Sequence, residues 1–536
     1  MKEEMSGDSP AATNLVNLED HRRGGRGGGG VPADLRELPL SDVWNGKWFA
    51  HLWGKTTRYN HETKEWLIYR GGRWCVDITG ERDRRITSSI EKMRDASPNE
   101  ALIAGKTPTQ LAEHYFKCLS SKSIAAMEVR ARAECHCTSD QFDTDPMLLN
   151  VANGTIDLNT GELRPAAAED MLMKQSPVEF DPDAQPGEWC AAMDQWFAGD
   201  KTMIAYMRRI AGLFLTGDVS DAAFFMLFGS GANGKGTFVS TLEAMLGGDY
   251  AFAIPVEYFL TTRNPPSHQV DVKAARGARL VVVGENEYGA QLNVGKIKLW
   301  TSGGDTMSGR GLHENLSQFL PTHKLLLQTN HEPRFNDNTH SFARRLKKIP
   351  FLVTIPDDKQ KLGLKKHLRE AELPGILNWA LGALKNEELK EGQLVGLADW
   401  RLNRLATPEK VKLATKEMLE SQDELRLFFE ETCELDASYE MSRDEGYIAY
   451  RNWCDQNRVR RPLGKRSFIS ALREQPDIQE AVSGRRNWRG WQGIRIGHAA
   501  SSSSGLCQLC PRKAISDDRC AEHPRGASSD GGDLFS

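Results

Sequence analysis

The chain has 536 residues, of which 39% are hydrophobic and 26% charged, and its formal net charge is −4. This length has room for two to four domains, and the balanced charge excludes a basic surface over the whole chain, so any nucleic-acid contact must be local. No apolar run approaches the roughly 18 residues of a membrane-spanning helix, and the ten cysteines are scattered, which together favour a cytoplasmic protein.

The N-terminal part divides into two regions by composition. Residues 1–40 are a Gly/Arg-rich tail, which we expect to be disordered. Residues 41–215 form a mixed region in which tryptophans alternate with turns. Periodicity predicts helices over 108–132 and 189–215, and the turn at Asn153–Gly154 predicts a short strand at 155–158.

A glycine-rich loop follows an apolar run and precedes a helical pattern. That strand–loop–helix context is the one in which backbone amides and a helix N-terminus cradle phosphates. We expect Lys235 to reach the β- and γ-phosphates of ATP. The position after it is glycine rather than the usual Ser or Thr, so Thr237 is the candidate Mg²⁺ ligand. The loop comprises Gly229, Ser230, Gly231, Ala232, Asn233, Gly234, Lys235, Gly236 and Thr237.

Polar side chains end the next two apolar strands. Glu285 and Glu287 follow the run at 280–283, and Asn330 follows the run at 325–328. Carboxylates at such a strand end are placed to hold Mg²⁺ and to polarise an attacking water. We assign Glu285 to the metal and Glu287 to the base, and the reverse assignment stays open. Asn330 is expected to contact the γ-phosphate and orient the water.

Basic residues flank this set. Arg344 and Arg345 are candidates to reach a neighbouring subunit's site, with ordinary surface salt bridges as the alternative. Lys296, Lys298 and Arg310 surround a Gly-Gly-Asp turn and are candidate DNA-backbone contacts, although a solvated basic turn would look the same.

Taken together, these motifs resemble those of superfamily 3 helicases, and within them the phage and plasmid primase-helicase branch that includes the poxvirus primase-helicase. The shared features are the glycine loop, Glu-x-Glu, a Lys-x-x-Thr-x-Gly-Gly-Asp element lengthened by Ser302, Thr-Asn and Arg-Arg-Leu. The resemblance implies an α/β, AAA+-like P-loop core at 216–355, and helical patterns predict a helical linker region at 356–439. It also implies a homo-hexameric ring that moves 3′ to 5′ on single-stranded DNA, in bacterial cytoplasm if a phage or plasmid encodes it. Relatives that prime DNA carry a separate catalytic domain, so we expect a helicase without primase activity of its own.

The C-terminal part contains a basic module and a cysteine cluster. Residues 440–497 resemble a winged helix, and between 451 and 495 eleven Lys or Arg face four Asp or Glu, a charge of +7. Its candidate DNA contacts are Lys465, Arg466, Arg485 and Arg486. The tail at 498–536 has paired ligands spaced for one structural Zn²⁺, and incidental cysteines are the alternative. These ligands would be Cys507, Cys510, Cys520 and His523.

The sequence therefore predicts an ATP-dependent DNA helicase that replicates a phage, prophage or plasmid. Its expected partners are single-stranded or forked DNA, further copies of the chain, and a separate primase or initiator. Two alternatives stay open: an ATP-gated origin-binding or assembly protein, and an AAA-type remodelling ATPase.

Overall fold

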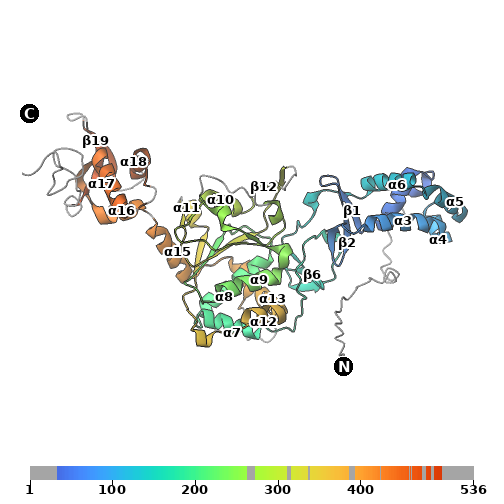
Figure 1. The fold of residues 1–536 in the computed structure, drawn as a ribbon, viewed down its shortest axis with the longest axis horizontal. Coiled ribbons are helices and arrows are strands. Elements are labelled where there is room, and N and C mark those ends of the chain that lie inside the picture. The colour runs from blue at the N-terminus through green and yellow to red at the C-terminus, as the bar shows by residue number, and fades with distance from the viewer. Residues whose placement is uncertain are drawn as a thin grey trace, which may run out of the picture. The chain divides into compact units, whose positions relative to one another are not determined.

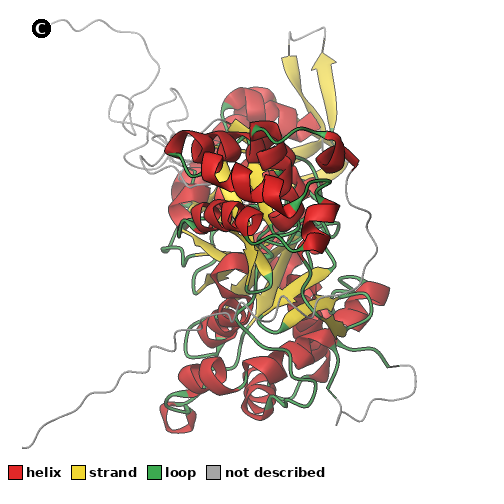
Figure 2. Ribbon diagram, turned by 90° about the vertical axis from the view of Figure 1, so that its right-hand side faces the viewer, coloured by secondary structure: helices red, strands yellow, loops and turns green. Residues whose placement is uncertain are grey.

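The computed structural model describes residues 33–261, 272–310, 316–335, 339–384, 393–422, 424–457, 459, 462–473, 478–483 and 488–497. They form a mixed α/β protein (Figures 1 and 2). The chain separates into two compact units, one holding most of the described residues up to Gln175 and the other most of those from Ser176 onward. Within the described ranges no helix is both long and apolar enough to cross a membrane.

The first unit packs helices around a small sheet with strand order β3-β2-β1-β4. Its core is aromatic: the rings of Trp44 and Trp48 stack at 5.5 Å, and both are fully buried. Its elements are α1 (Ala33–Glu37), α2 (Asp42–Trp53), β1 (Thr57–Asn60), β2 (Glu65–Arg70), β3 (Arg73–Val76), α3 (Glu81–Arg94), α4 (Pro98–Ile103), α5 (Pro108–Cys118), α6 (Ser121–Glu134) and β4 (His136–Cys137).

Two stretches that we expected to be single helices are each broken in two. The pattern over 108–132 continues across α5 and α6, but Ser120 caps α6 by accepting from the Ser123 amide. The pattern over 189–215 is divided into α7 (Gly187–Trp196) and α8 (Lys201–Leu215), where Gly199 has a positive φ of 73° and Asp200 caps α8. Caps of this kind supply the amide partners that a new helix needs, so each one starts a separate helix.

Short strands lie between these helices. They form a three-stranded sheet of β5 (Leu148–Val151), β6 (Gly154–Asp157) and β7 (Glu162–Arg164). The second of them confirms the strand predicted after the Asn153–Gly154 turn.

The second unit is built on a five-stranded sheet in which every pairing is parallel. Its strand order is β16 (Leu346–Pro350), β8 (Phe224–Phe228), β14 (Lys324–Thr329), β10 (Leu280–Val283) and β9 (Ala251–Ile254). The first strand in sequence, β8, therefore lies between the fifth and the fourth, so the chain order reverses beside it. The carboxyl ends of parallel strands at such a reversal are where open α/β sheets bind ligands.

Both faces of this sheet are covered, and β8, β9 and β10 are apolar throughout. On one face Met226, Val281 and Leu325 pack with Ile297 and Trp300 of α10 (Val294–Trp300). On the other face Phe225 meets Phe214 of α8 edge-on at 5.3 Å. The crossover helix α9 (Lys235–Tyr250) joins β8 to β9 and contacts β10 and β14.

Smaller elements complete the core of this unit. They are β11 (Gln291–Leu292) paired with β15 (Arg334–Phe335), the antiparallel ribbon β12 (Met307–Arg310) and β13 (Leu316–Phe319), α11 (His340–Ala343), α12 (Leu364–Ala371), α13 (Leu373–Leu381), α14 (Gly396–Asn403) and α15 (Glu409–Ser421). Helix α12 packs on α9, and α15 packs on β16.

The C-terminal module has its own core, in which Phe428, Tyr450, Phe468 and Trp491 are buried together. Its sheet has the order β17-β19-β18, and the long strand β17 was not expected from the sequence. Its elements are α16 (Glu424–Thr432), β17 (Cys433–Ser442), α17 (Arg443–Gln456), α18 (Lys465–Arg473), β18 (Gln479–Ser483) and β19 (Trp488–Ile496). The winged-helix assignment and the predicted domain boundaries stay predictions.

Candidate functional site

The glycine-rich loop joins the end of β8 to the start of α9, as its sequence context predicts. Gly231 and Gly234 have positive φ angles of 103° and 90°, a region that glycine enters without steric cost. Ala232 also has a positive φ, of 47°. The loop therefore turns back on itself before α9 begins at Lys235.

Neighbouring segments approach the loop so closely at Gly229 and Gly234 that neither position has room for a side chain. A Cβ at Gly234 would lie 2.3 Å from the ring of Trp196, and one at Gly229 would lie 2.2 Å from the carbonyl oxygen of Phe351. The segment after β16 also holds the loop by hydrogen bonds. Asn233 donates its amide to the Phe351 carbonyl at 3.1 Å, and the Ile355 amide donates to the Ala232 carbonyl at 2.8 Å.

The Lys235 ammonium is buried at the centre of the loop. It donates to the Gly229 carbonyl at 2.8 Å, to Asn233 Oδ1 at 3.0 Å and to Asn330 Oδ1 at 3.0 Å. Burial lowers the pKa of Lys235, and the nearby Glu285 carboxylate opposes that shift. Its three hydrogen-bond donors are thus already oriented into one small volume.

Asn330 links the lysine to an acid. Its Nδ2 donates to Glu285 Oε1 at 2.7 Å, so hydrogen bonds connect Lys235 at the start of α9 through Asn330 after β14 to Glu285 after β10. Glu287 is exposed, and the neighbouring Asn286 donates to its backbone carbonyl and to that of His331. The structure therefore brings Glu285 to the loop but does not bring the Glu287 carboxylate into contact with it.

These residues surround an open cavity of about 360 Å³. Gly236 and Thr237 line it from α9, and Glu285 and Asn330 line it from the neighbouring strand ends. Two further lining residues, Gln328 and Lys365, were not expected from the sequence. The sequence could have indicated Gln328, because it is the penultimate residue of the predicted strand that precedes Asn330. Lys365 lies on a separate helix, α12, and no local motif marks it.

The arginine pair follows α11 and lies outside the lining of this cavity. The Arg345 guanidinium donates to the Thr301 carbonyl at 3.2 Å and to the Ser341 carbonyl at 2.6 Å, while burial lowers its pKa. The Arg344 side chain is exposed. Of the two, Arg344 is the one whose side chain is open to another subunit, and the role predicted for the pair stays a prediction.

The basic residues around the Gly-Gly-Asp turn have partners within the chain. The Lys296 ammonium donates to the Tyr258 carbonyl and lies 4.7 Å from the centre of the Tyr258 ring. Lys298 donates to Thr339 Oγ1 at 2.8 Å. Arg310 ends β12, and its side chain lies outside the described residues. DNA contact by these three residues stays a prediction.

In the C-terminal module, several basic side chains form ion pairs with acids of the same module. Lys465 pairs with Asp444, and Arg473 pairs with Glu480 at 2.9 Å. Arg466 is exposed. Arg485, Arg486 and all four candidate zinc ligands lie outside the described residues, and among the residues that are described no cluster suited to a metal ion occurs.

The fold and this site define a structural class of protein. Its members have an α/β fold with a parallel sheet and a glycine loop whose lysine is hydrogen-bonded to an asparagine that also binds an acid, both after strand ends. Comparisons with known proteins show what the chain is similar to. Residues 46–198 match the family model described as "D5 N terminal like". This match and the relatives below confirm the predicted resemblance to primase-helicases.

Three relatives, all provisionally named as helicases, come from viruses. The chain is 27% identical to L207/L206 of Acanthamoeba polyphaga mimivirus over 59% of its length, 25% identical to 022R of Frog virus 3 (isolate Goorha) over 67%, and 25% identical to 121R of Invertebrate iridescent virus 3 over 65%. The chain spans only 34%, 43% and 39% of these relatives. Among solved structures, the NrS-1 C-terminal region aligns with a TM-score of 0.46 at 11% identity, covering 86% of this chain and all of that one.

Proposed function

We propose that the chain is an ATP-hydrolysing DNA helicase. The observation that carries this proposal is the chain of hydrogen bonds from Lys235, where the glycine loop meets α9, through Asn330 to Glu285 at two parallel strand ends. An ammonium, amides and a carboxylate gathered at a helix N-terminus are the groups that bind and cleave a nucleoside triphosphate. The names of the viral relatives support coupling of that hydrolysis to nucleic acid.

Each residue has a separate task in this proposal. The Lys235 ammonium holds the β- and γ-phosphates, and phosphate oxygens replace one or more of its present carbonyl and amide acceptors. Asn330 turns its carbonyl oxygen to Lys235 and its NH₂ to Glu285, so it can orient a water beside the γ-phosphate. Glu287 is the proposed base for that water, and Arg344 with Arg345 would stabilise charge in the site of an adjacent subunit.

The site also fits Mg²⁺, which the proposed activity requires. Glu285 and Thr237 line the same cavity and offer oxygen donors, the ligand type that this ion prefers. Bound there, the ion would neutralise charge on the phosphates. Ring assembly, 3′-to-5′ movement, and replication of a phage, prophage or plasmid follow from the motif resemblance and belong to the proposal alone.

ATP turnover and strand displacement together test the function. We expect ATP hydrolysis that single-stranded DNA stimulates, displacement of forked DNA carrying a 3′ tail, and loss of both activities in Lys235→Ala. Exposed Lys416 of α15, which reaches Glu420, is a matched lysine, and Lys416→Ala should behave like wild type. Hydrolysis stimulated by protein but not by DNA would favour a remodelling ATPase. ATP-dependent DNA binding without displacement from either tail would favour an origin-binding protein.

A further inference from the structure

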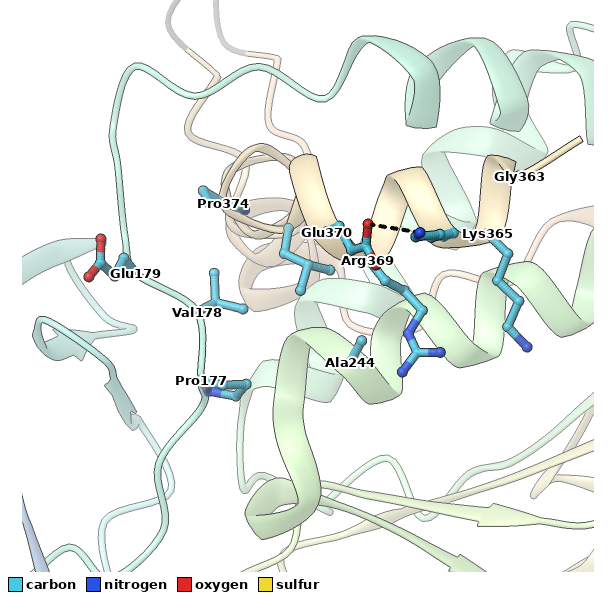
Figure 3. Close-up of a pocket in the computed structure, with 11 residues that line it drawn as sticks. Pro177, Val178, Glu179, Ala244, Gly363, Lys365, Arg369, Glu370 and Pro374 are labelled. Carbon is cyan, nitrogen blue, oxygen red and sulfur yellow. Dashed lines mark ion pairs between the residues drawn. The ribbon is translucent and has the colours of Figure 1, made fainter. Parts of the chain in front are cut away.

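Helix α12 brings a second lysine to the nucleotide cavity. Lys365 lines this cavity together with Lys235, Glu285 and Asn330, although α12 begins only after the whole sheet is complete. Helix α12 packs along α9, the helix that starts at Lys235. Figure 3 shows Lys365 and Arg369, which are one helical turn apart, extending from α12 toward α9.

The charge balance of the cavity points to a role for this lysine. The charged residues among its described lining are Lys235, Glu285 and Lys365. The first two cancel, and the Lys235 ammonium already donates to three oxygens of the protein. Without Lys365 the cavity would be neutral, although its proposed ligand carries several negative charges. Lys365 supplies the net positive charge.

Lys365 is also available, unlike its neighbour on the same helix. It is exposed, and among the described residues no hydrogen bond or ion pair within 4 Å engages its ammonium. Lys366, by contrast, pairs with Glu370 at 4.0 Å. Lys365 interacts electrostatically with Glu243 of α9. Burial raises the pKa of Glu243, and the charges of Lys365 and Arg369 oppose that shift.

We propose that Lys365 is a second phosphate-binding lysine, which contacts the β- or γ-phosphate of the bound nucleotide from α12. This inference rests on the proposed function and adds a residue from outside the sheet to the same site. Lys365 also lines a cavity of about 490 Å³ along α9 and the groove of about 910 Å³ shown in Figure 3. Its long side chain therefore stands where the nucleotide cavity opens toward the α9–α12 groove, and contact with phosphate would fix α12 against α9.

Direct binding of two probes tests the inference on the full chain: a slowly hydrolysed ATP analogue with Mg²⁺, and AMP. We expect Lys365→Ala to weaken the analogue about tenfold, equivalent to about 1.4 kcal/mol, and to leave AMP within about twofold. Lys365→Arg should retain most of the affinity, because the charge is kept. Lys366→Ala is the matched control and should bind both probes like wild type. Each variant changes an exposed side chain, and its melting temperature verifies folding.

Three results would contradict the role proposed for Lys365. Analogue binding by Lys365→Ala within about twofold of wild type, equal losses for AMP and the analogue, or an equal loss in Lys366→Ala would each overturn the assignment. Those results differ from failure of the proposed function, in which wild type and Lys235→Ala would bind the analogue equally well or not at all. That outcome would overturn both.

Discussion

At the scale of single residues, Asn330 is the link on which the site depends. An amide is the side chain that can accept from an ammonium with its oxygen and donate to a carboxylate with its nitrogen, and Asn330 does both, at 3.0 and 2.7 Å. The lysine and the acid therefore stay apart and aligned rather than closing into a direct ion pair. The cavity is left open between them.

The two glutamates show how far residue-level prediction extends. Both were expected at the end of the apolar strand, and that strand, β10, is present as predicted. Beyond Val283, however, the chain is a loop in which Asn286 is fixed by the carbonyls of Glu287 and His331. The direction of side chains in a loop does not follow the alternation of a strand, so the sequence could not show that Glu285 alone meets Asn330.

The roles of these acids can be separated by replacing each with its amide. We expect Glu287→Gln to bind ATP normally but to hydrolyse it about 10²–10⁴-fold more slowly, the usual loss when a general base is removed. Glu285→Gln should instead raise the Mg²⁺ concentration needed for activity. Turnover measured against Mg²⁺, with nucleotide binding in parallel, provides the check. Normal turnover in Glu287→Gln together with abolished turnover in Glu285→Gln would transfer the role of base to Glu285.

At the scale of elements, the glycine loop is shaped by what surrounds it as much as by its own sequence. Local patterns predicted β8, the loop and α9, because apolar runs, glycines and helix starts are short-range signals. Trp196 and Phe351, which enclose the loop, come from distant parts of the chain. No local motif marks either of them, so the close fit around Gly229 and Gly234 could not be predicted.

Replacing Gly234 tests that fit. Gly234→Ala should cost about 1–3 kcal/mol in backbone strain, with a further loss from the clash with Trp196, and nucleotide affinity should fall by at least tenfold. The double variant with Trp196→Ala should recover the part due to the clash and not the part due to φ. Gly248→Ala, also on α9 but with open space around its Cβ, is the control and should be neutral or slightly stabilising. Thermal unfolding and analogue binding are the measurements, and equal behaviour of the two alanine variants would contradict the account.

At the scale of the whole molecule, the fold class could be predicted from the sequence, whereas the ion pairing of the charged residues could not. The mixed α/β class with a parallel sheet is confirmed, and it was predicted from the strand–loop–helix context of the glycine loop and from the motif resemblance. The excess of +7 between residues 451 and 495 did not reveal which charges are free, because acids of β17 and α17 that lie outside this stretch pair with its basic residues. Glu434, for example, pairs with Arg495.

Stability should depend on the buried histidine His323, which directly precedes strand β14. Burial lowers the pKa of His323 to about 3, and its ring lies 5.0 Å from that of Trp300. The unfolded chain takes up a proton near pH 6.5, so this stabilisation is complete above that pH and is lost as pH falls toward 3, by up to about 1.4 kcal/mol per pH unit. His323→Leu removes this contribution, so its melting temperature should fall less steeply between pH 6.5 and 4. Parallel curves for the two proteins would refute the prediction.

Strand β16 connects the arginine pair to the segment that holds the glycine loop. Arg345 immediately precedes this strand. Phe351, whose carbonyl accepts a hydrogen bond from Asn233, immediately follows it. Exposed Arg344 and partly buried Arg345 therefore lie at one end of β16, and the segment that holds the glycine loop lies at the other. If a neighbouring subunit contacts Arg344, as the proposal expects, the five residues of β16 connect that contact to the segment that holds the glycine loop.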